Sequence, residues 1–482
     1  MKRRAFLKYC HTAAVSLSFP LLSISRPVQA GHLGKPPNFM LITADDLNYD
    51  SVGCYGCAIP GITPNIDRLA ASGMRFTNAH VNIAVCQPCR QSIMTGRYPH
   101  RNGARGFEPI DEAVPTLQES LHDAGYLNGI LGKEIHLQPK HKYCWDYYIT
   151  EGQLASGAGI GRSPQRYYEY AKTFLDMAKD RNKPFFLMAN SHDPHRPFAG
   201  SAQEKATWGH DLPTFTRSFQ GDQVPVPDFL PDLPDVRKEI AEYYTSVYRC
   251  DQSVGAVLKA LKESGLEEGT MVMFLSDNGM ALPFAKANCY LASTKTPWIV
   301  CWPGRVKPGS VDSEHFISGI DYMATVLDAA GIKAVDGMDG FSLLPLLAER
   351  KQPGRKYVFT EFHKTFARRA FPMRCVQNKQ FGYIFNAWAG KTDPMRMDST
   401  SGLTFKAMQE AGKSNPQIAT RVTLFEHRVP EEFFDFKEDP GALNNLISDP
   451  RYRDEIEHMR RILENRMKRT NDPLLHDFQH RK

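Results

Sequence analysis

The sequence predicts an α/β fold in which helices cover both faces of a large mixed, mostly parallel sheet. From Asn38 to about Gly331, short apolar runs alternate with stretches of helical periodicity, which is the pattern of parallel strands joined by helices. Beyond this region, closely spaced apolar runs and a terminal amphipathic stretch predict a smaller antiparallel sheet with a helix. We therefore expect a large domain at residues 31–365 and a C-terminal α+β domain at residues 366–482.

Residues 1–30 have the features of a cleavable export signal. Arg3 and Arg4 start a twin-arginine motif, an apolar run follows at residues 13–24, and Val28-Gln29-Ala30 provides a small-residue exit. The apolar run is too short to span a bilayer, so we expect cleavage and no membrane anchor. An amphipathic helix is disfavoured because no acidic residue occurs before position 31. We expect the chain to be exported, to the periplasm or beyond the cell.

Removal of this leader changes the charge of the chain. The full sequence has a net charge of +6, and residues 1–30 hold five basic residues and no acidic one, which leaves about +1 for the mature chain. A nearly neutral protein does not present the broad basic field that nucleic acids need, so we expect no nucleic-acid partner. The ten cysteines have no regular spacing and do not imply a disulfide framework. Cys54 and Cys57 are interpreted as ordinary loop thiols.

The first predicted strand ends in two adjacent acids. The apolar run from Asn38 to Thr43 leads into Asp45 and Asp46, and α/β folds place their sites at the carboxyl ends of such strands. Neighbouring carboxylates repel each other, so a cation would stabilise the pair, and oxygen ligands favour calcium or magnesium. For this dipeptide alone, a solvated turn with a helix cap is the better interpretation.

Cys86 stands at the start of a predicted helix. It forms a C-x-P-x-R pattern with Pro88 and Arg90, and Thr95-Gly96-Arg97 follows. A helix N-terminus and a neighbouring arginine both favour negative charge, so we expect this thiol to be reactive or modified. Taken alone, the stretch favours a dithiol or half of a zinc site formed by Cys86 and Cys89. That interpretation explains none of the Asp, Asn and Lys clusters elsewhere in the chain.

Three later strand ends also carry polar clusters. The predicted strands at residues 126–131, 185–190 and 270–275 are followed, in that order, by Lys133 and His136, by His192, His195 and Arg196, and by Asp277, Asn278 and Lys286. Together with Arg90, this set suits an anionic tetrahedral group held between a divalent metal and several fixed cations, with proton transfer nearby.

The remaining elements read as scaffold. Apolar spacing with proline starts and glycine stops predicts helices at residues 64–73, 116–124, 164–179, 236–264 and 318–330. A further strand is expected at residues 298–302, and the Pro-rich residues 199–236 are expected to form an extended lobe. In the C-terminal domain we expect strands at residues 357–362, 374–377 and 381–388 and a helix at residues 454–468.

With these motifs the chain resembles the type I sulfatases of the alkaline-phosphatase-like superfamily. The C-x-P-x-R pattern with the later T-G-R is similar to that family's maturation signature, in which the cysteine is oxidised to formylglycine. Asp45-Asp46 and Asp277-Asn278 resemble its calcium-binding pairs. Residues 192–196, the Pro-rich residues 224–234 and residues 371–374 look like the heparan N-sulfatase (sulfamidase) branch.

The resemblance implies a role for each matching residue. Asp45, Asp46, Asp277, Asn278 and the modified Cys86 would bind calcium. Formylglycine, as its hydrate, would attack sulfur, with Arg90 holding the hydrate and Asp277 assisting its deprotonation. His195 would protonate the leaving group, and His136 would take the proton when sulfate is expelled. Lys133 and Lys286 would hold sulfate oxygens. Arg196, His363 and Arg374 are candidates for contacting the sugar.

Three positions depart from the family pattern. One extra residue stands in Gly132-Lys133-Glu134-Ile135-His136, where the family has G-K-x-H. Lys286 aligns with an arginine of the sulfamidase branch, which keeps the charge but loses bidentate geometry. Cys89 stands where serine is common, and a disulfide there is an open alternative.

The expected substrate is N-sulfated glucosamine in heparan-type saccharides. An O-sulfated host or algal glycan is the alternative, because loops decide this specificity. An enzyme acting on phosphodiesters or phosphonates and a non-catalytic glycan-binding protein are rival hypotheses. The expected partners are a sulfated saccharide and the formylglycine-maturation enzyme, and a homodimer is left open.

Overall fold

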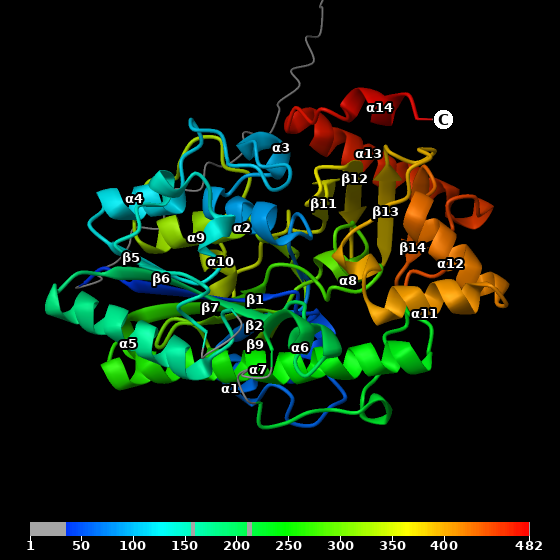
Figure 1. Cartoon of the computed structure of the whole chain (residues 1–482). Coiled ribbons are helices and arrows are strands. Elements are labelled where there is room, and N and C mark those ends of the chain that lie inside the picture. Colours follow the sequence, from blue (N-terminus) through cyan, green and yellow to red (C-terminus); the bar gives the residue numbers. More distant parts are fainter. Residues whose placement is uncertain (1–34, 156–159, 210–214, 482) are drawn as a thin grey trace, which may run out of the picture. The chain divides into compact units, whose positions relative to one another are not determined.

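Eight strands form the central sheet of the computed structural model, which describes residues 35–155, 160–209 and 215–481 (Figure 1). In spatial order they are β5 (Tyr147–Ile149), β4 (Leu127–Leu131), β6 (Phe185–Pro194), β1 (Asn38–Asp45), β7 (Thr270–Ser276), β8 (Trp298–Cys301), β2 (Met74–Phe76) and β9 (Ser310–Asp312). Only β8 runs against its neighbours, so this is a mixed, mostly parallel sheet. The predicted α/β class is confirmed.

The register of the sheet brings particular residues side by side. Thr43 of β1 lies opposite Asn190 of β6, and Ala44 lies opposite Ser276 of β7. Because β6, β1 and β7 are parallel neighbours, their carboxyl ends meet at one edge. A small parallel pair, β3 (Ala79–His80) with β10 (Ile317–Ser318), lies outside this sheet.

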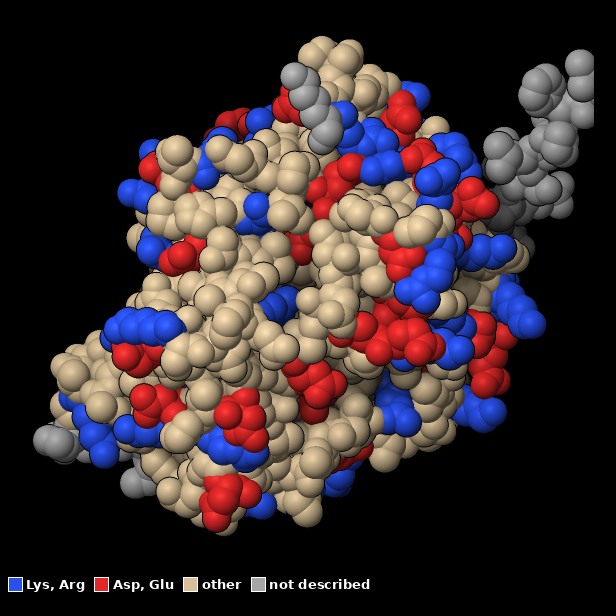
Figure 2. Space-filling model, turned by 90° about the vertical axis from the view of Figure 1, so that its right-hand side faces the viewer, with Lys and Arg blue, Asp and Glu red and all other residues tan. Residues whose placement is uncertain are grey.

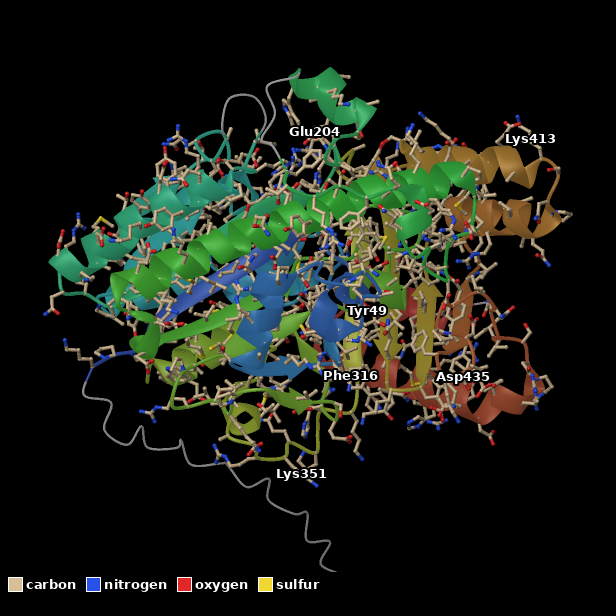
Figure 3. The ribbon with its side chains drawn as sticks, turned by 90° about the horizontal axis from the view of Figure 1, so that it is seen from below. Tyr49, Glu204, Phe316, Lys351, Lys413 and Asp435 are labelled. Atoms are coloured by element: carbon tan, nitrogen blue, oxygen red, sulfur yellow. The ribbon has the colours of Figure 1, made fainter. Side chains whose placement is uncertain are left out.

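Helices cover both faces of the sheet (Figure 1). One layer contains α2 (Cys86–Thr95), α3 (Pro99–Asn102), α4 (Leu117–Asp123), α9 (Asp321–Ala329) and α10 (Leu344–Leu347). The other contains α1 (Pro64–Ala71), α5 (Pro164–Asp180), α6 (Ala202–Trp208) and α7 (Pro234–Ser264). Figure 3 shows the long helix α7 crossing beneath the sheet beside α5.

Local sequence signals explain where these helices begin and end. Pro164 and Pro234 occupy first helical positions, where the missing N–H costs nothing. Thr116 and Glu119 form a capping box at the start of α4. Gly265 ends α7 with φ of 72°, a conformation that glycine adopts without strain.

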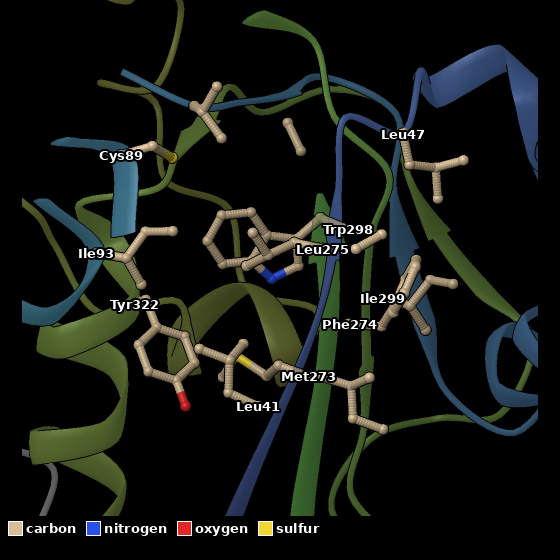
Figure 4. Close-up of a cluster of buried hydrophobic side chains, with 14 of the residues drawn as sticks. Leu41, Leu47, Cys89, Ile93, Met273, Phe274, Leu275, Trp298, Ile299 and Tyr322 are labelled. Carbon is tan, nitrogen blue, oxygen red and sulfur yellow. The ribbon is translucent and has the colours of Figure 1, made fainter. Parts of the chain in front are cut away.

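The main core lies between the sheet and its helices. Figure 4 shows part of it, in which Leu41 of β1, Leu275 of β7 and Trp298 of β8 belong to one buried cluster with Ile93 and Tyr322. Ile93 lies on α2 and Tyr322 on α9. The first residues of α2 are therefore fixed by packing of the same helix against the sheet.

A four-stranded antiparallel sheet follows, with β11 (Val358–Lys364), β12 (Ala370–Gln377), β13 (Phe381–Asn386) and β14 (Glu431–Asp435) in order. Four helices accompany it: α11 (Leu403–Gly412), α12 (Pro416–His427), α13 (Arg453–Arg469) and α14 (Leu475–Gln479). β11 pairs with β12, so this sheet takes its first strand from residues assigned to the large domain. Residues 36–482 form one compact unit, and a boundary at residue 366 stays a prediction.

Several elements differ from the expectations. The Pro-rich lobe contains the short helix α6, and β6 continues to Pro194, four residues beyond the predicted end. α11 and α12 were not predicted. The proposed export signal lies outside the described residues, and within those residues no helix is both long and apolar enough to cross a membrane.

Acidic and basic side chains are interspersed on the face drawn in Figure 2, and neither sign covers it as a continuous field. The nine cysteines that the structure describes are all free thiols. Cys89 is among them, so the disulfide left open for that position does not form here.

Candidate active site

Four strand ends converge at one edge of the central sheet. Asp45 is the last residue of β1, Asp277 follows β7 directly, and Lys133 follows β4 by two residues. His195 comes immediately after β6. The polar clusters that the sequence spreads over more than 230 positions therefore face a common point, as the parallel topology requires.

Arg90 lies at the centre of this site and contacts residues from several elements. It lies on α2 one turn after Cys86 and is fully buried. Its Nε and Nη2 donate to one oxygen of Asp277, at 2.9 and 2.6 Å, and its Nη1 donates to Thr43 Oγ1 at 2.7 Å and Asn190 Oδ1 at 2.6 Å. This guanidinium ties α2 to β1, β6 and β7, so the position of Cys86 is fixed by three strands.

The pKa of the Cys86 thiol is raised, although its position at a helix N-terminus alone would lower it. Burial, followed by the charge of Asp45, raises the pKa of Cys86 to about 12, although Lys286 and Lys133 act in the opposite direction. The expectation that the helix and Arg90 favour a thiolate is thus outweighed by burial. An unmodified Cys86 stays a neutral thiol at physiological pH, which makes it a poor nucleophile or redox dithiol.

Four buried oxygen-bearing residues lie together at the ends of β1 and β7. Asn278 Nδ2 donates to Asp46 Oδ1 at 2.6 Å, and the Asp46 N–H donates to Asp277 Oδ1 at 3.2 Å. Asp45 Oδ1 and Asn278 Oδ1 are buried without a hydrogen-bond partner among the described residues, and Asp45 Oδ2 pairs with Lys133. Such orphaned oxygens are what a hard cation binds. The set fits calcium.

The negative charges of these carboxylates would also be stabilised by a bound cation. Burial raises the pKa of both Asp46 and Asp277 to about 7, with Asp45 adding to the effect. For Asp45, burial is opposed by Lys133, His195 and Arg90, which hold its pKa well below the ordinary value. Three carboxylates this close repel one another, and a bound divalent cation would favour their ionised forms.

Two lysines approach the same cluster. Lys133 forms an ion pair with Asp45, and Lys286 Nζ lies 2.8 Å from Asp46 Oδ2 and 2.8 Å from Asp398 Oδ2. Both lysines are almost fully buried. They offer ammonium groups beside Cys86, where an anion would be bound.

Two histidines face the site as neutral imidazoles. Burial lowers the pKa of His195 to about 3 and that of His136 well below its usual value, with Lys286 acting on the first and Lys133 on the second. His195 Nδ1 donates to the Arg196 carbonyl at 2.6 Å, which leaves Nε2 facing Asp46 at 3.9 Å. His136 Nδ1 is buried without a partner among the described residues.

The extra residue before His136 does not displace it from the site. Glu134–His136 forms a 3-10 turn, η3, and Glu134 accepts the backbone N–H of Glu151 at 3.1 Å. This turn absorbs the additional residue. His136 stays on the cavity wall, and Ile135 takes a place on the same wall.

A cavity of about 610 Å³ opens above Cys86. Its wall combines catalytic candidates with apolar and charged side chains: Val85, Cys86, Phe107, Lys133, Ile135, His136, Glu151, Ile160, His192, His195, Arg196, Pro197, Trp208, Lys286, Ala287, Thr365, Phe366, Ala367, Arg396, Met397 and Asp398. Asp45, Asp46, Asp277 and Asn278 lie buried beyond this wall. The cavity has the size of a site for a small organic ligand.

Arg196 reaches this cavity, but most of its donors are used. Its Nη1 donates to Glu239 Oε1 at 2.6 Å and its Nε to the Ala281 carbonyl at 3.1 Å. Its Nη2 is buried without a partner among the described residues. This nitrogen lies close to Gly402, which does not line the cavity.

His363 and Arg374 do not reach the cavity, contrary to the expectation that they contact the sugar. Arg374 donates twice to Asp472, at 2.5 and 2.9 Å, and His363 Nε2 lies 3.0 Å from Glu361. His100 binds the other oxygen of Glu361 at 2.7 Å. Both residues are buried in this network, so we assign them a structural role.

Sequence reasoning did not single out three residues of the site. Asn190 positions Arg90, Asp398 pairs with Lys286, and Glu151 lies 3.4 Å from His192 on the cavity wall. Asn190 ends the predicted strand and could have been suspected from its position. Glu151 and Asp398 come from irregular segments, where no periodic pattern marks a side chain as functional.

Two protein-family models and several known proteins match this chain. The family model described as Sulfatase matches residues 37–332, and one described as N-sulphoglucosamine sulphohydrolase, C-terminal, matches residues 281–404. Human N-sulphoglucosamine sulphohydrolase is 32% identical, over 91% of this chain and 91% of its own. An ulvan-active sulfatase of Formosa agariphila is 28% identical, over 92% of this chain and 82% of its own.

The fold is shared with solved structures as well. A protein described in complex with its substrate, D-glucosamine-2-N,6-O-disulfate, matches with a TM-score of 0.68 at 20% identity. The match covers 91% of this chain and 99% of that one.

Proposed function

Because this chain belongs to the sulfatase family, we propose that it removes sulfate from N-sulfated glucosamine of heparan-type saccharides, using formylglycine formed from Cys86. One observation carries the proposal. Cys86 lies at the floor of a cavity, at the start of α2, beside two buried lysines and a cluster of buried carboxylates in which Asp45 Oδ1 has no hydrogen-bond partner among the described residues.

Formylglycine at position 86 could accept and release the sulfuryl group, which the Cys86 thiol cannot do. Burial keeps the Cys86 thiol protonated, and sulfate transferred to sulfur would have no simple way to leave. A hydrated aldehyde carries two hydroxyl groups on one carbon, so one can receive the sulfuryl group and the other can expel it as sulfate. Asp45, Asp46, Asp277 and Asn278 would hold calcium, which offsets the negative charge of nucleophile and substrate.

The cations of the chain would position the sulfate. Lys133 and Lys286 flank Cys86, and each is paired with a carboxylate of the cluster. Their ammonium groups would bind sulfate oxygens while staying anchored, so little reorganisation accompanies the reaction. Arg90 would hold the hydrate through its fixed orientation on α2.

Two histidines would transfer protons in different steps of the reaction. His195 donates from Nδ1 to a carbonyl, so its free Nε2 can carry a proton to the leaving nitrogen once the sulfate anion favours the imidazolium. His136 is neutral and its Nδ1 is unpaired, which suits it to accept the proton when sulfate is expelled. Asp277 would assist deprotonation of the hydrate.

The choice of N-sulfated glucosamine rests on the sulfamidase-type match of residues 281–404 and on the human relative. The resemblance to an ulvan-active sulfatase keeps an O-sulfated polysaccharide as the second candidate. The function also implies a maturation enzyme that acts on Cys86 and export through the leader at residues 1–30. A homodimer remains compatible with this function.

The test compares two cysteines that lie one turn apart. Cys86→Ala should abolish sulfate release from N-sulfoglucosamine while leaving the fold intact, because it removes the nucleophile. Cys89→Ala, a matched control in the same buried helix, should retain turnover. Release from 6-O-sulfoglucosamine and from an aryl phosphodiester should be far slower.

Three outcomes would contradict the proposal or part of it. Substantial turnover by the Cys86→Ala protein would refute the nucleophile. Release from the O-sulfated sugar alone would keep the sulfatase and replace the substrate with the second candidate. Faster cleavage of the phosphodiester than of either sulfate would favour the phosphoryl-transfer hypothesis instead.

A further inference from the structure

The outer part of the active-site cavity carries large apolar side chains that the fold leaves uncovered. Phe366 is 79% exposed and Ile135 is 52% exposed, whereas Cys86 on the same cavity wall is 5% exposed. This gradient places Phe366 and Ile135 toward the mouth and Cys86 at the floor. Exposed apolar groups on a cavity wall indicate a surface that a ligand covers.

Phe107 connects these residues to the reacting end of the cavity. Its ring meets the Phe366 ring edge to face, with centroids 5.1 Å apart, and the His136 ring in the same manner at 6.3 Å. Such contacts fix the orientation of aromatic rings. Phe107, Ile135 and Phe366, here called the apolar rim, thus form a surface that runs from His136 outward.

Ile135 belongs to this surface because of the extra residue before His136. The η3 turn is anchored by Glu134, which accepts the N–H of Glu151. With its neighbours on both sides buried, Ile135 alone of the three η3 residues is exposed. The added residue therefore contributes an apolar side chain to the cavity without displacing His136.

The same cavity also presents polar groups suited to hydroxyls. Asp398 and Arg396 line it, and each side chain is more than a third exposed. A pyranose ring offers both chemistries, with C–H groups on its faces and hydroxyls at its edge. Asp398 pairs with Lys286 and Arg396 with Glu426, but a purely apolar chain would still take the exposed part of both side chains out of water, which costs binding free energy.

From this arrangement we propose that the apolar rim is a subsite for a second pyranose ring, the one linked to the sulfated glucosamine. The inference rests on the proposed function, because the sulfate must reach Cys86 at the floor. The sulfated ring then occupies the inner cavity, and the next ring along the saccharide lies at the mouth. There its C–H face covers Phe366 and Ile135, and its hydroxyl edge meets the polar groups.

Phe366→Ala tests this assignment, with Phe341→Ala as a matched control. Phe341 is 68% exposed but does not line this cavity. For each protein, KM and kcat are measured on N-sulfoglucosamine and on a disaccharide with N-sulfoglucosamine at its non-reducing end. Loss of one stacking contact should lower the preference for the disaccharide about tenfold, through KM and not kcat. Phe341→Ala should leave the preference as in the wild type.

Equilibrium binding separates this inference from the proposed function. Calorimetric titration with the desulfated disaccharide and monosaccharide requires no turnover and should show the same tenfold loss of preference in Phe366→Ala. If the wild-type protein does not turn over N-sulfated sugars but Phe366→Ala still shows the tenfold loss of binding preference, the proposed substrate is refuted and the subsite is kept. An unchanged preference in Phe366→Ala, or an equal loss on both sugars, would overturn the subsite.

Discussion

A buried ionic network beneath His195 gives a quantitative prediction. Asp193 accepts hydrogen bonds from Arg249, at 2.7 and 3.0 Å, and from Arg162 at 2.9 Å, and Arg249 also donates to Glu204 at 2.9 Å. All four side chains are almost completely buried. Asp193→Asn removes one negative charge and leaves two guanidinium groups with a single carboxylate.

The cost of this change follows from the burial of its partners. Breaking a buried ion pair on one side leaves an uncompensated charge and typically destabilises a protein by about 3 to 5 kcal/mol. Arg162 also donates to the His195 carbonyl at 2.8 Å and to the Pro197 carbonyl at 3.1 Å. Asp193→Asn should therefore lower kcat as well, because the loop that carries His195 loses its support.

Urea unfolding followed by tryptophan fluorescence measures the stability, and sulfate release below the transition measures kcat. Glu169→Gln serves as the control because it breaks an exposed pair with Arg166 on α5 and should leave both quantities unchanged. Arg249→Met in the Asp193→Asn background should cost less than the sum of the single changes, since the residues share contacts. A stability loss under 1 kcal/mol (about fivefold in the equilibrium constant) for Asp193→Asn would refute the reasoning.

Two further predictions concern calcium and pH. Removal of calcium with EGTA should abolish activity and lower the melting temperature, because three buried carboxylates lose their counter-ion. A ligand at a thousandfold excess over its Kd stabilises the folded state by about 4 kcal/mol. An unchanged melting curve would contradict the metal site. Burial, with a smaller effect of Lys295, lowers the pKa of His80 to about 3 in the folded state. The unfolded chain takes up that proton first as pH falls below about 6.5, so the folded state should lose about 2 kcal/mol by pH 5. His80→Gln should abolish this part of the pH dependence in urea titrations, and an identical pH profile would exclude His80 as its source.

Much of the site could be predicted because its residues follow strands that are recognisable from sequence. Asp45 and Asp277 come directly after apolar runs, and parallel topology brings such ends together without knowledge of any contact. The same logic explains Lys133 and His195. α11 and α12 were not predicted, since they lie in a segment without a strong apolar period.

Properties that depend on burial or on distant partners could not be predicted. The Cys86 thiol has neighbours that favour negative charge, yet desolvation decides its pKa, and only the packed structure reveals that. Arg374 looks available in sequence, but its partner Asp472 lies 98 positions away. Asp398 likewise meets Lys286 through tertiary structure alone.

The most direct measurement is peptide mass spectrometry of residue 86 in protein from its own host, paired with sulfate release from N-sulfoglucosamine. The account predicts a peptide with the mass of formylglycine and release of sulfate by the same preparation. An unmodified Cys86 peptide in protein that nevertheless turns over the sugar would contradict the proposed nucleophile. An unmodified peptide without turnover of N- or O-sulfated sugars would instead favour a non-catalytic glycan-binding protein.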